Sequence, residues 1–191
     1  MKGAHKSKAT RRRRPTWPEP TLPIDGVVFA VDPGPVECGW CLLEVHPGAV
    51  PVVGEHGHDL VEDVLRKLRG LRKHLALVAV EAIVPHSLHG VPGASKATLA
   101  TQLVIGRFAE AARGIPFVQL SRREVIHGLL GYFPTAGVRV SKRQMQDAVQ
   151  EILALEEPIR PQHANDACCA GLAVTKKLEE ALETSTEEDA A

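Results

Sequence analysis

The sequence predicts one α/β domain built on a mixed, five-stranded sheet with helices on both of its faces. Two stretches, residues 27–32 and 75–81, are almost continuously apolar, as strands are when both faces of a sheet are covered. Residues 61–71 instead repeat apolar side chains every three or four positions, which is typical of an amphipathic helix. The alternation of such strands and helices over residues 75–120 indicates parallel strands joined by a helical crossover.

The order of the elements follows from turn and capping signals. Three strands come first and a turn-like segment separates the second from the third, so we expect them to be mostly antiparallel. Ser121 and Ser141 each precede a Glu or Gln three positions later, a capping pattern that begins a helix. The other predicted elements are strands at residues 27–32, 38–46, 50–56, 75–81 and 115–120 and helices at residues 59–75, 95–113 and 163–183.

Composition places the chain among ordinary globular proteins. Hydrophobic residues make up 44% and charged residues 24% of 191 residues, enough for one domain with a substantial core. No apolar run approaches the roughly 20 residues of a membrane span, and the N-terminal segment lacks the apolar stretch of a secretory signal. We therefore expect a cytoplasmic protein without a membrane partner.

Charge is unevenly distributed although the formal net charge is zero. Basic residues dominate positions 1–14, without an acid among them, and acids dominate the last residues of the chain. The predicted organisation is a disordered basic arm at 1–24, one folded domain at 25–178 and an acidic tail at 179–191. The arm either adds nonspecific affinity for phosphate backbones or is a solvated tail.

The four cysteines give only weak signals of redox or zinc chemistry. Cys38 and Cys41 form a C-x-x-C, but in a strand residues three apart point to opposite faces. Cys168 and Cys169 lie in an apolar helical stretch and are interpreted as small buried side chains.

Two acids end the two most apolar strands. Asp32 follows the first strand and Glu81 ends the strand at 75–81. Asp32 alone fits a simple cap of the Pro33–Gly34 turn. If the two strands are parallel neighbours, however, both carboxylates lie at one edge of the sheet, within reach of a shared cation.

A second pair of candidates lies on the last predicted helix. His163 and Asp166 are three residues apart and therefore share a helix face. The helix dipole favours a negative charge near that N-terminus. The alternative is local capping chemistry with an incidental acid.

Four segments together resemble the RuvC family of Holliday junction resolvases, endonucleases of the ribonuclease H-like superfamily. These segments are, in order, FAVDPGPVECGWCLLE, LALVAVE, GVRVSKRQMQDAVQEILAL and HANDACCAGLAV. The resemblance spans roughly residues 26–175 and implies a ribonuclease H-like fold. It also implies a homodimer that places two active sites on opposite strands of a four-way DNA junction.

The resemblance implies a metal-dependent active site as well. Asp32, Glu81, His163 and Asp166 match the family's catalytic positions and would bind two Mg²⁺ ions, or Mn²⁺, to hydrolyse a DNA phosphodiester. Such ions activate a water and stabilise the leaving 3′ oxygen. For His163 two roles stay open, ligand of an ion or general acid–base on the water, since imidazoles perform both.

Basic residues of the matching segments are candidates for contact with the DNA backbone. Arg139, Lys142 and Arg143 correspond to basic positions of the family, and Arg122, Arg123 and Lys96 extend this surface on weaker grounds. The alternative is an exposed, solvated helix start. Family members often carry an aromatic wedge shortly after the Glu, where this chain has Val84, Pro85 and His86.

Tyr132 and Phe133 are two of the few aromatic residues of the chain. They either stack on DNA or belong to the core.

Three other functions compete with junction cleavage. The actin-like ATPases and sugar kinases also place an acid before a glycine at a strand end, but they need a second domain and further phosphate loops that 191 residues do not supply. A noncatalytic branched-DNA-binding module and a nuclease for RNA–DNA hybrids or other branched DNA share the expected fold, so the sequence leaves both open.

Overall fold

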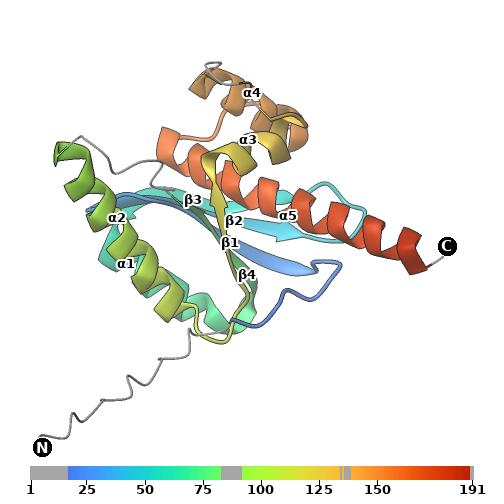
Figure 1. Ribbon diagram of the computed structural model, residues 1–191, viewed down its shortest axis with the longest axis horizontal. Helices are drawn as coiled ribbons and strands as arrows, with labels where there is room; N and C mark the ends of the chain where they lie inside the picture. Colours follow the sequence, from blue (N-terminus) through green and yellow to red (C-terminus); the bar gives the residue numbers. More distant parts are fainter. Residues whose placement is uncertain (1–16, 83–91, 134, 136–138, 190–191) are drawn as a thin grey trace, which may run out of the picture.

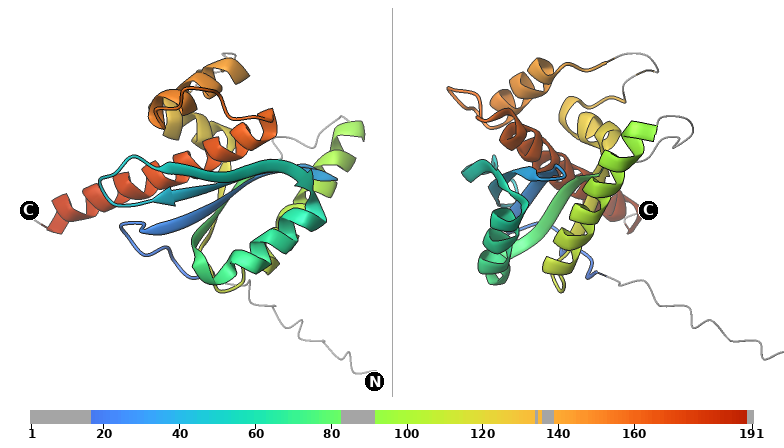
Figure 2. Two further views of the ribbon diagram at one scale, coloured as in Figure 1. Left: turned by 180° about the vertical axis from the view of Figure 1, so that it is seen from behind. Right: turned by 90° about the vertical axis from the view of Figure 1, so that its left-hand side faces the viewer.

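The computed structural model describes residues 17–82, 92–133, 135 and 139–189 and shows helices packed on both faces of one sheet (Figures 1 and 2). The sheet has five strands in the order β3-β2-β1-β4-β5. The elements are β1 (Gly26–Pro33), β2 (Glu37–Val45), β3 (Val52–Leu60), α1 (Val61–Leu71), η1 (Arg72–His74), β4 (Leu75–Ala82), α2 (Pro92–Ala111), β5 (Phe117–Ser121), α3 (Arg122–Leu130), α4 (Lys142–Ile152) and α5 (Gln162–Asp189). The predicted α/β class with a mixed five-stranded sheet is confirmed.

Strand direction brings three carboxyl ends to the same edge of the sheet. β1, β2 and β3 are antiparallel neighbours, whereas β4 runs parallel to β1 and β5 parallel to β4. The chain returns between these parallel strands through α1 and α2, as the alternating pattern predicted. Asp32 and Glu81 therefore end neighbouring strands at a single edge.

The two faces of the sheet have separate cores because the side chains of a strand alternate. Phe29 and Val31 of β1 point to one face and pack with α1 and α2. Val28 and Ala30 point to the other, where α5 lies against the sheet with α3 and α4 beyond it (Figure 1). Asp32 continues the second series, so its side chain emerges on the α5 face.

Small residues let α5 lie close to the sheet. A Cβ added at Gly171 would meet the side chains of Leu43 and Ala30. Cys168 and Cys169 are buried in the same layer. Cys38 and Cys41 lie in opposite cores, and all four thiols are free and buried, so the packing interpretation of the cysteines is confirmed.

Some element boundaries differ from those predicted. β3 continues to Leu60, taking residues assigned to the following helix, because β2 pairs with it along this stretch. α2 begins at Pro92 rather than Ser95, and α5 runs on to Asp189, through most of the expected acidic tail.

Residues 17–24, which the sequence assigned to the arm, pack on the domain. The indole N–H of Trp17 donates to the carbonyl of Ala109 at 3.2 Å, and its ring lies 5.7 Å from that of Phe117. Partial burial of this large ring and burial of Ile24 explain the difference. Residues 1–16 lie outside the described part of the chain. Within that part, no helix has the length and apolarity needed to cross a membrane.

Candidate metal centre

Three of the four predicted site residues lie together where α5 begins beside the end of β1. Each of Asp32, His163 and Asp166 offers one ligand atom, and these atoms lie within 4.8 Å of one another. His163 and Asp166 fall on one face of the first turns of α5, as their spacing predicted. Val31 pairs with Val80, so Glu81 follows on the strand next to Asp32.

The close approach of α5 to β2 depends on Gly39. Gly39 pairs directly with Asp32, and a Cβ added to it would overlap the backbone carbonyl of His163. The first turn of α5 therefore lies in the space that the missing side chain leaves, beside Asp32. Sequence reasoning missed this residue, although a glycine inside a strand pattern is a known sign of close backbone approach.

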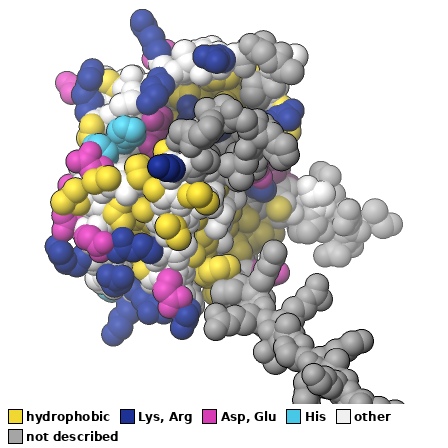
Figure 3. Space-filling model, turned by 60° about the vertical axis from the view of Figure 1, so that its left-hand side comes forward, with side chains coloured by type: hydrophobic (Ala, Val, Ile, Leu, Met, Phe, Trp, Pro, Cys, Tyr) yellow, Lys and Arg dark blue, Asp and Glu magenta, His cyan; other side chains and the backbone are white. Residues whose placement is uncertain are grey.

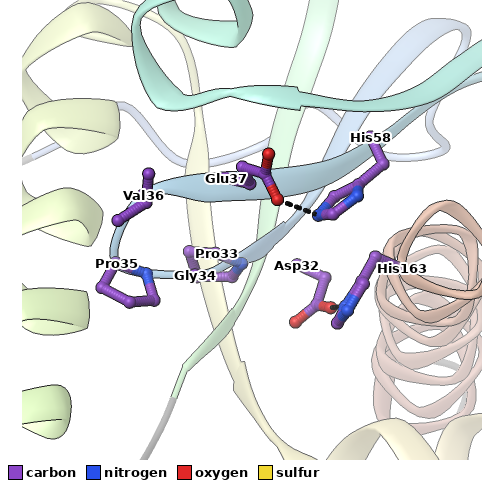
Figure 4. Close-up of a pocket in the computed structure, with 8 residues that line it drawn as sticks. All are labelled: Asp32, Pro33, Gly34, Pro35, Val36, Glu37, His58 and His163. Atoms are coloured by element: carbon purple, nitrogen blue, oxygen red, sulfur yellow. Dashed lines mark hydrogen bonds and ion pairs between the residues drawn. The ribbon is translucent and has the colours of Figure 1, made fainter.

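Asp32 and His163 form the open side of the cluster. Nδ1 of His163 lies 2.9 Å from Oδ2 of Asp32, and half of the histidine side chain is exposed. Both line a pocket of about 330 Å³ that the β1–β2 turn borders (Figure 4). This side is accessible to a substrate from solvent.

Asp166 lies on the closed side, with 6% of its side chain exposed. Nζ of Lys142 lies 3.3 Å from Oδ2, and the side-chain amide of Gln162 donates to Oδ1 at 3.4 Å. Lys142 is the first residue of α4, which begins with the predicted capping box at Ser141. Arg122 adds positive charge, since its guanidinium lies 3.9 Å from Oδ1 of Asp166.

Arg122 also connects Glu81 to this side of the cluster. Its Nη1 donates to Oε2 of Glu81 at 3.3 Å, from the start of α3, where the capping box at Ser121 is present as predicted. Burial raises the pKa of Glu81 to about 7. Arg122 opposes this rise in pKa, and the charges of Asp32 and Asp166 add to it.

The donor set fits a hard divalent cation. Carboxylate oxygens are what Mg²⁺ prefers, and a single imidazole nitrogen among them also suits Mn²⁺. Buried carboxylates this close together repel one another unless a cation compensates them. Arg122 and Lys142 supply part of that positive charge from the protein itself.

The other predicted DNA-binding residues differ in how they relate to the cluster. Arg123 is exposed and lies over the ring of Phe133, 5.2 Å from its centroid. Arg143 is exposed, 3.9 Å from Asp147 on its own helix. Arg139 and Lys96 are exposed as well. Lys142 instead contacts Asp166 directly. Arg122, which the sequence supported only weakly, lies close to both Glu81 and Asp166.

Tyr132 and Phe133 are 47% and 51% exposed, so the interpretation that they belong to the core is wrong. Phe133 instead stacks on His127, with ring centroids 3.9 Å apart. Stacking on DNA stays a prediction. The wedge positions at 84–86 lie outside the described residues.

Among known proteins, the chain is similar to solved structures. No protein-family model and no curated sequence matches the chain. RuvC of Thermus thermophilus matches with a TM-score of 0.59 and 19% identity, over 81% of this chain and 96% of that one. The same RuvC in complex with a Holliday junction substrate gives a TM-score of 0.62 and 18% identity, with the same coverage.

A more distant match is the yeast mitochondrial Holliday junction resolvase Ydc2. Its TM-score is 0.50 at 11% identity, over 81% of this chain and 82% of that one. At these identities the matches show a shared fold. The chain therefore has the ribonuclease H-like fold of the RuvC resolvases, and the fold implied by the sequence resemblance is confirmed.

Proposed function

We propose that this chain, with its RuvC-like fold, is a metal-dependent, structure-selective DNA endonuclease that resolves four-way junctions by paired hydrolytic nicks. The observation that carries the proposal is the cluster of Asp32, His163 and Asp166 beside Glu81. Elements far apart in the sequence converge there, on the open edge of the sheet. A turn cap or an incidental helix acid would not require such convergence.

Asp32, His163 and Asp166 would hold one divalent ion, and Glu81 would share in binding a second. When bound, such ions supply an activated water and stabilise charge on the leaving 3′ oxygen. Mg²⁺ is the expected ion and Mn²⁺ a substitute, because the set combines carboxylates with one imidazole. His163 is assigned to ion binding, since its ring nitrogen lies among the carboxylate oxygens.

Basic side chains around the cluster suit the backbone of the cut strand. Lys142 and Arg122 already lie at the carboxylates and are near enough to attract a phosphate placed over them. Arg139, Arg143, Arg123 and Lys96 would contact phosphates farther along the strand. Such contacts position DNA without reading its sequence.

A homodimer is part of this proposal, because paired nicks on opposite strands need two sites. Leu99 and Leu103 are one helical turn apart on α2 and are 59% and 72% exposed. Figure 3 shows hydrophobic side chains gathered on the face that α1 and α2 cover, with Lys and Arg side chains around them. Two copies joined through α2 would bury these leucines.

The test is cleavage of a labelled synthetic four-way junction in Mg²⁺ or Mn²⁺, beside a linear duplex and an RNA–DNA hybrid. We expect symmetric paired nicks on the junction alone. Asp32→Asn should lower the rate on the order of a thousandfold or more, the several kcal/mol that a metal ion contributes, and leave junction binding largely intact.

Three results would redirect the proposal. Junction binding without cleavage in either metal would make the chain a noncatalytic branched-DNA-binding module. Cleavage of the hybrid alone would make it a ribonuclease. Wild-type cleavage by Asp32→Asn would show that the metal centre is wrongly assigned.

A further inference from the structure

His58 lies against the candidate metal centre although neither its position on β3 nor its sequence context assigns it a role. Its ring stacks on that of His163, with centroids 4.6 Å apart and planes 25° apart. The two histidines are far apart in the chain and come from the third strand and the last helix. Their contact therefore needs an explanation from the sheet.

The register of the sheet supplies it. Gly39 of β2 pairs with Asp32 on one side and with His58 on the other. Residues directly opposite one another on neighbouring strands point to the same face. Asp32 and His58 thus stand on either side of a glycine, and His163 lies over that glycine.

His163 is consequently held from two directions. Nδ1 lies 2.9 Å from Oδ2 of Asp32, and the ring of His58 covers the imidazole (Figure 4). Because half of the His163 side chain is exposed, packing from α5 alone leaves the ring room to rotate toward solvent. A flat neighbour removes that freedom.

Glu37 lies beside the ring of His58. Glu37 precedes Gly39 by two residues on β2, so it points to the same face. Its Oε2 lies 3.7 Å from Nε2 of His58, as the dashed line in Figure 4 marks. Glu37 and His58 also line the pocket beside the cluster.

We propose that His58, supported by Glu37, is a positioning residue that keeps the ring of His163 oriented for binding a divalent metal ion. The inference rests on the proposed function, since it assumes that His163 is a ligand. His58 acts through the stacked ring. Among the described residues, the set whose ligand atoms lie within 4.8 Å of one another contains His163 but not His58. Outer residues that orient a ligating imidazole typically change metal affinity by about 10- to 100-fold.

The test is titration of the full-length chain with Mn²⁺, without DNA, followed by electron paramagnetic resonance of the free ion. We expect His58→Ala to weaken Mn²⁺ binding about tenfold. His58→Phe should recover most of the affinity, because phenylalanine keeps a flat ring that can stack but has no nitrogen for a metal or a proton. Glu37→Gln should weaken binding less than His58→Ala, because it leaves the ring of His58 in place.

His56→Ala is the matched control. His56 lies two residues earlier on β3, is exposed, and contacts only the carbonyl of Gly54 among the interactions found in the described chain. It should bind Mn²⁺ like the wild type. In cleavage assays His58→Ala should need about tenfold more Mn²⁺ for half-maximal rate, recover its rate at saturating metal, and bind the junction unchanged.

Different failures can be told apart. If His58→Ala binds Mn²⁺ as tightly as the wild type while Asp32→Asn loses the ion, the role of His58 is wrong and the proposed metal centre stands. If His58→Phe and His58→Ala weaken Mn²⁺ binding equally, His58 does not act through stacking of its ring, and the inference is overturned. If Asp32→Asn binds Mn²⁺ as the wild type does, the proposed metal centre itself is wrong.

Discussion

The metal centre has two sides, which differ in exposure and in the contacts that position their side chains. One side holds Asp32 and His163, and the other holds Glu81 and Asp166. The first pair lines an open pocket, and its geometry follows from a glycine that admits the first turn of α5. The second pair is largely buried, and Arg122 lies between its carboxylates. Shape thus fixes the open side, whereas charge compensation fixes the closed side.

This difference implies that the two sides respond to different perturbations. A steric change should disturb Asp32 and His163 at every pH. A change of charge or of pH should act on Glu81 and Asp166, where the low exposure of the carboxylates strengthens electrostatic effects. Variants that change one side at a time therefore test whether shape and charge act separately.

The largest effect is expected from Gly39→Ala on the open side. The added Cβ would overlap the carbonyl of His163, so α5 must shift away from β2. Overpacking of this kind costs about 3 kcal/mol, and we expect cleavage to fall at least about 100-fold, since misplacement by 1 Å can do so. Urea unfolding and junction cleavage measure the two effects.

Gly54→Ala is the control for that prediction. Gly54 lies on the neighbouring strand, and a Cβ there would meet Leu42 only at an ordinary contact distance of 3.7 Å. Its stability and cleavage should stay near those of the wild type. A Gly39→Ala variant with wild-type cleavage would show that shape does not fix the open side.

The next effect concerns the pH dependence of stability on the closed side. The folded pKa of Glu81 is raised from 4.5 to about 7, so in that window the folded chain keeps a proton that the unfolded chain releases. Stability is therefore lost as pH rises from about 4.5 to about 7. In metal-free buffer the free energy of unfolding of Glu81→Gln should be larger than that of the wild type by roughly 1–3 kcal/mol at pH 8. At pH 4.5 the two should differ little.

Glu124→Gln provides a control of opposite sign. Lys177 and Ser121 lower the pKa of Glu124 to about 2, so its ionised form stabilises the fold above the unfolded pKa, and this is lost as pH falls toward 2. Glu124→Gln should thus be less stable than the wild type at pH 8. Thermal unfolding at several pH values distinguishes the variants, and a Glu81→Gln variant that is no more stable than the wild type at pH 8 would contradict the buried-charge interpretation.

The acids and the sheet were predictable from the sequence for the same reason. Alternation along an apolar strand fixes the face of every side chain, and parallel strands share an edge, so Asp32 and Glu81 could be placed together. His163 and Asp166 followed from helical spacing. These inferences use only local periodicity and strand direction.

The contacts that hold the site were not predictable in this way. The stacking of His58 on His163 depends on the register between β2 and β3, which a strand pattern does not give. The reach of Arg122 to two carboxylates depends on where α3 begins relative to β4 and α5. Both are tertiary facts that a linear pattern leaves undetermined.

A smaller effect is expected when charge is removed from the closed side. Arg122→Gln leaves Glu81 and Asp166 without the guanidinium between them, so the pKa of Glu81 should rise further and metal-free stability at pH 8 should fall by about 1 kcal/mol. Lys142→Gln should cost less, about 0.5 kcal/mol, because the lysine side chain is mostly exposed. Mn²⁺ should stabilise both variants more than the wild type in thermal unfolding, because the ion replaces the missing charge. Equal stabilisation of all three would contradict charge compensation.

The smallest effect on stability is expected at Arg123, which follows Arg122 in the sequence and lies over the ring of Phe133. Arg123→Gln removes an exposed cation and should change stability by less than about 0.5 kcal/mol. If its guanidinium contacts a DNA phosphate, junction affinity should fall and the dependence of log K on log salt should lose about one unit of slope. Filter binding over a range of salt concentrations measures this, with Arg113→Gln as the control, since Arg113 pairs with Glu110 at the end of α2. An unchanged slope for Arg123→Gln would remove Arg123 from the proposed DNA-binding surface.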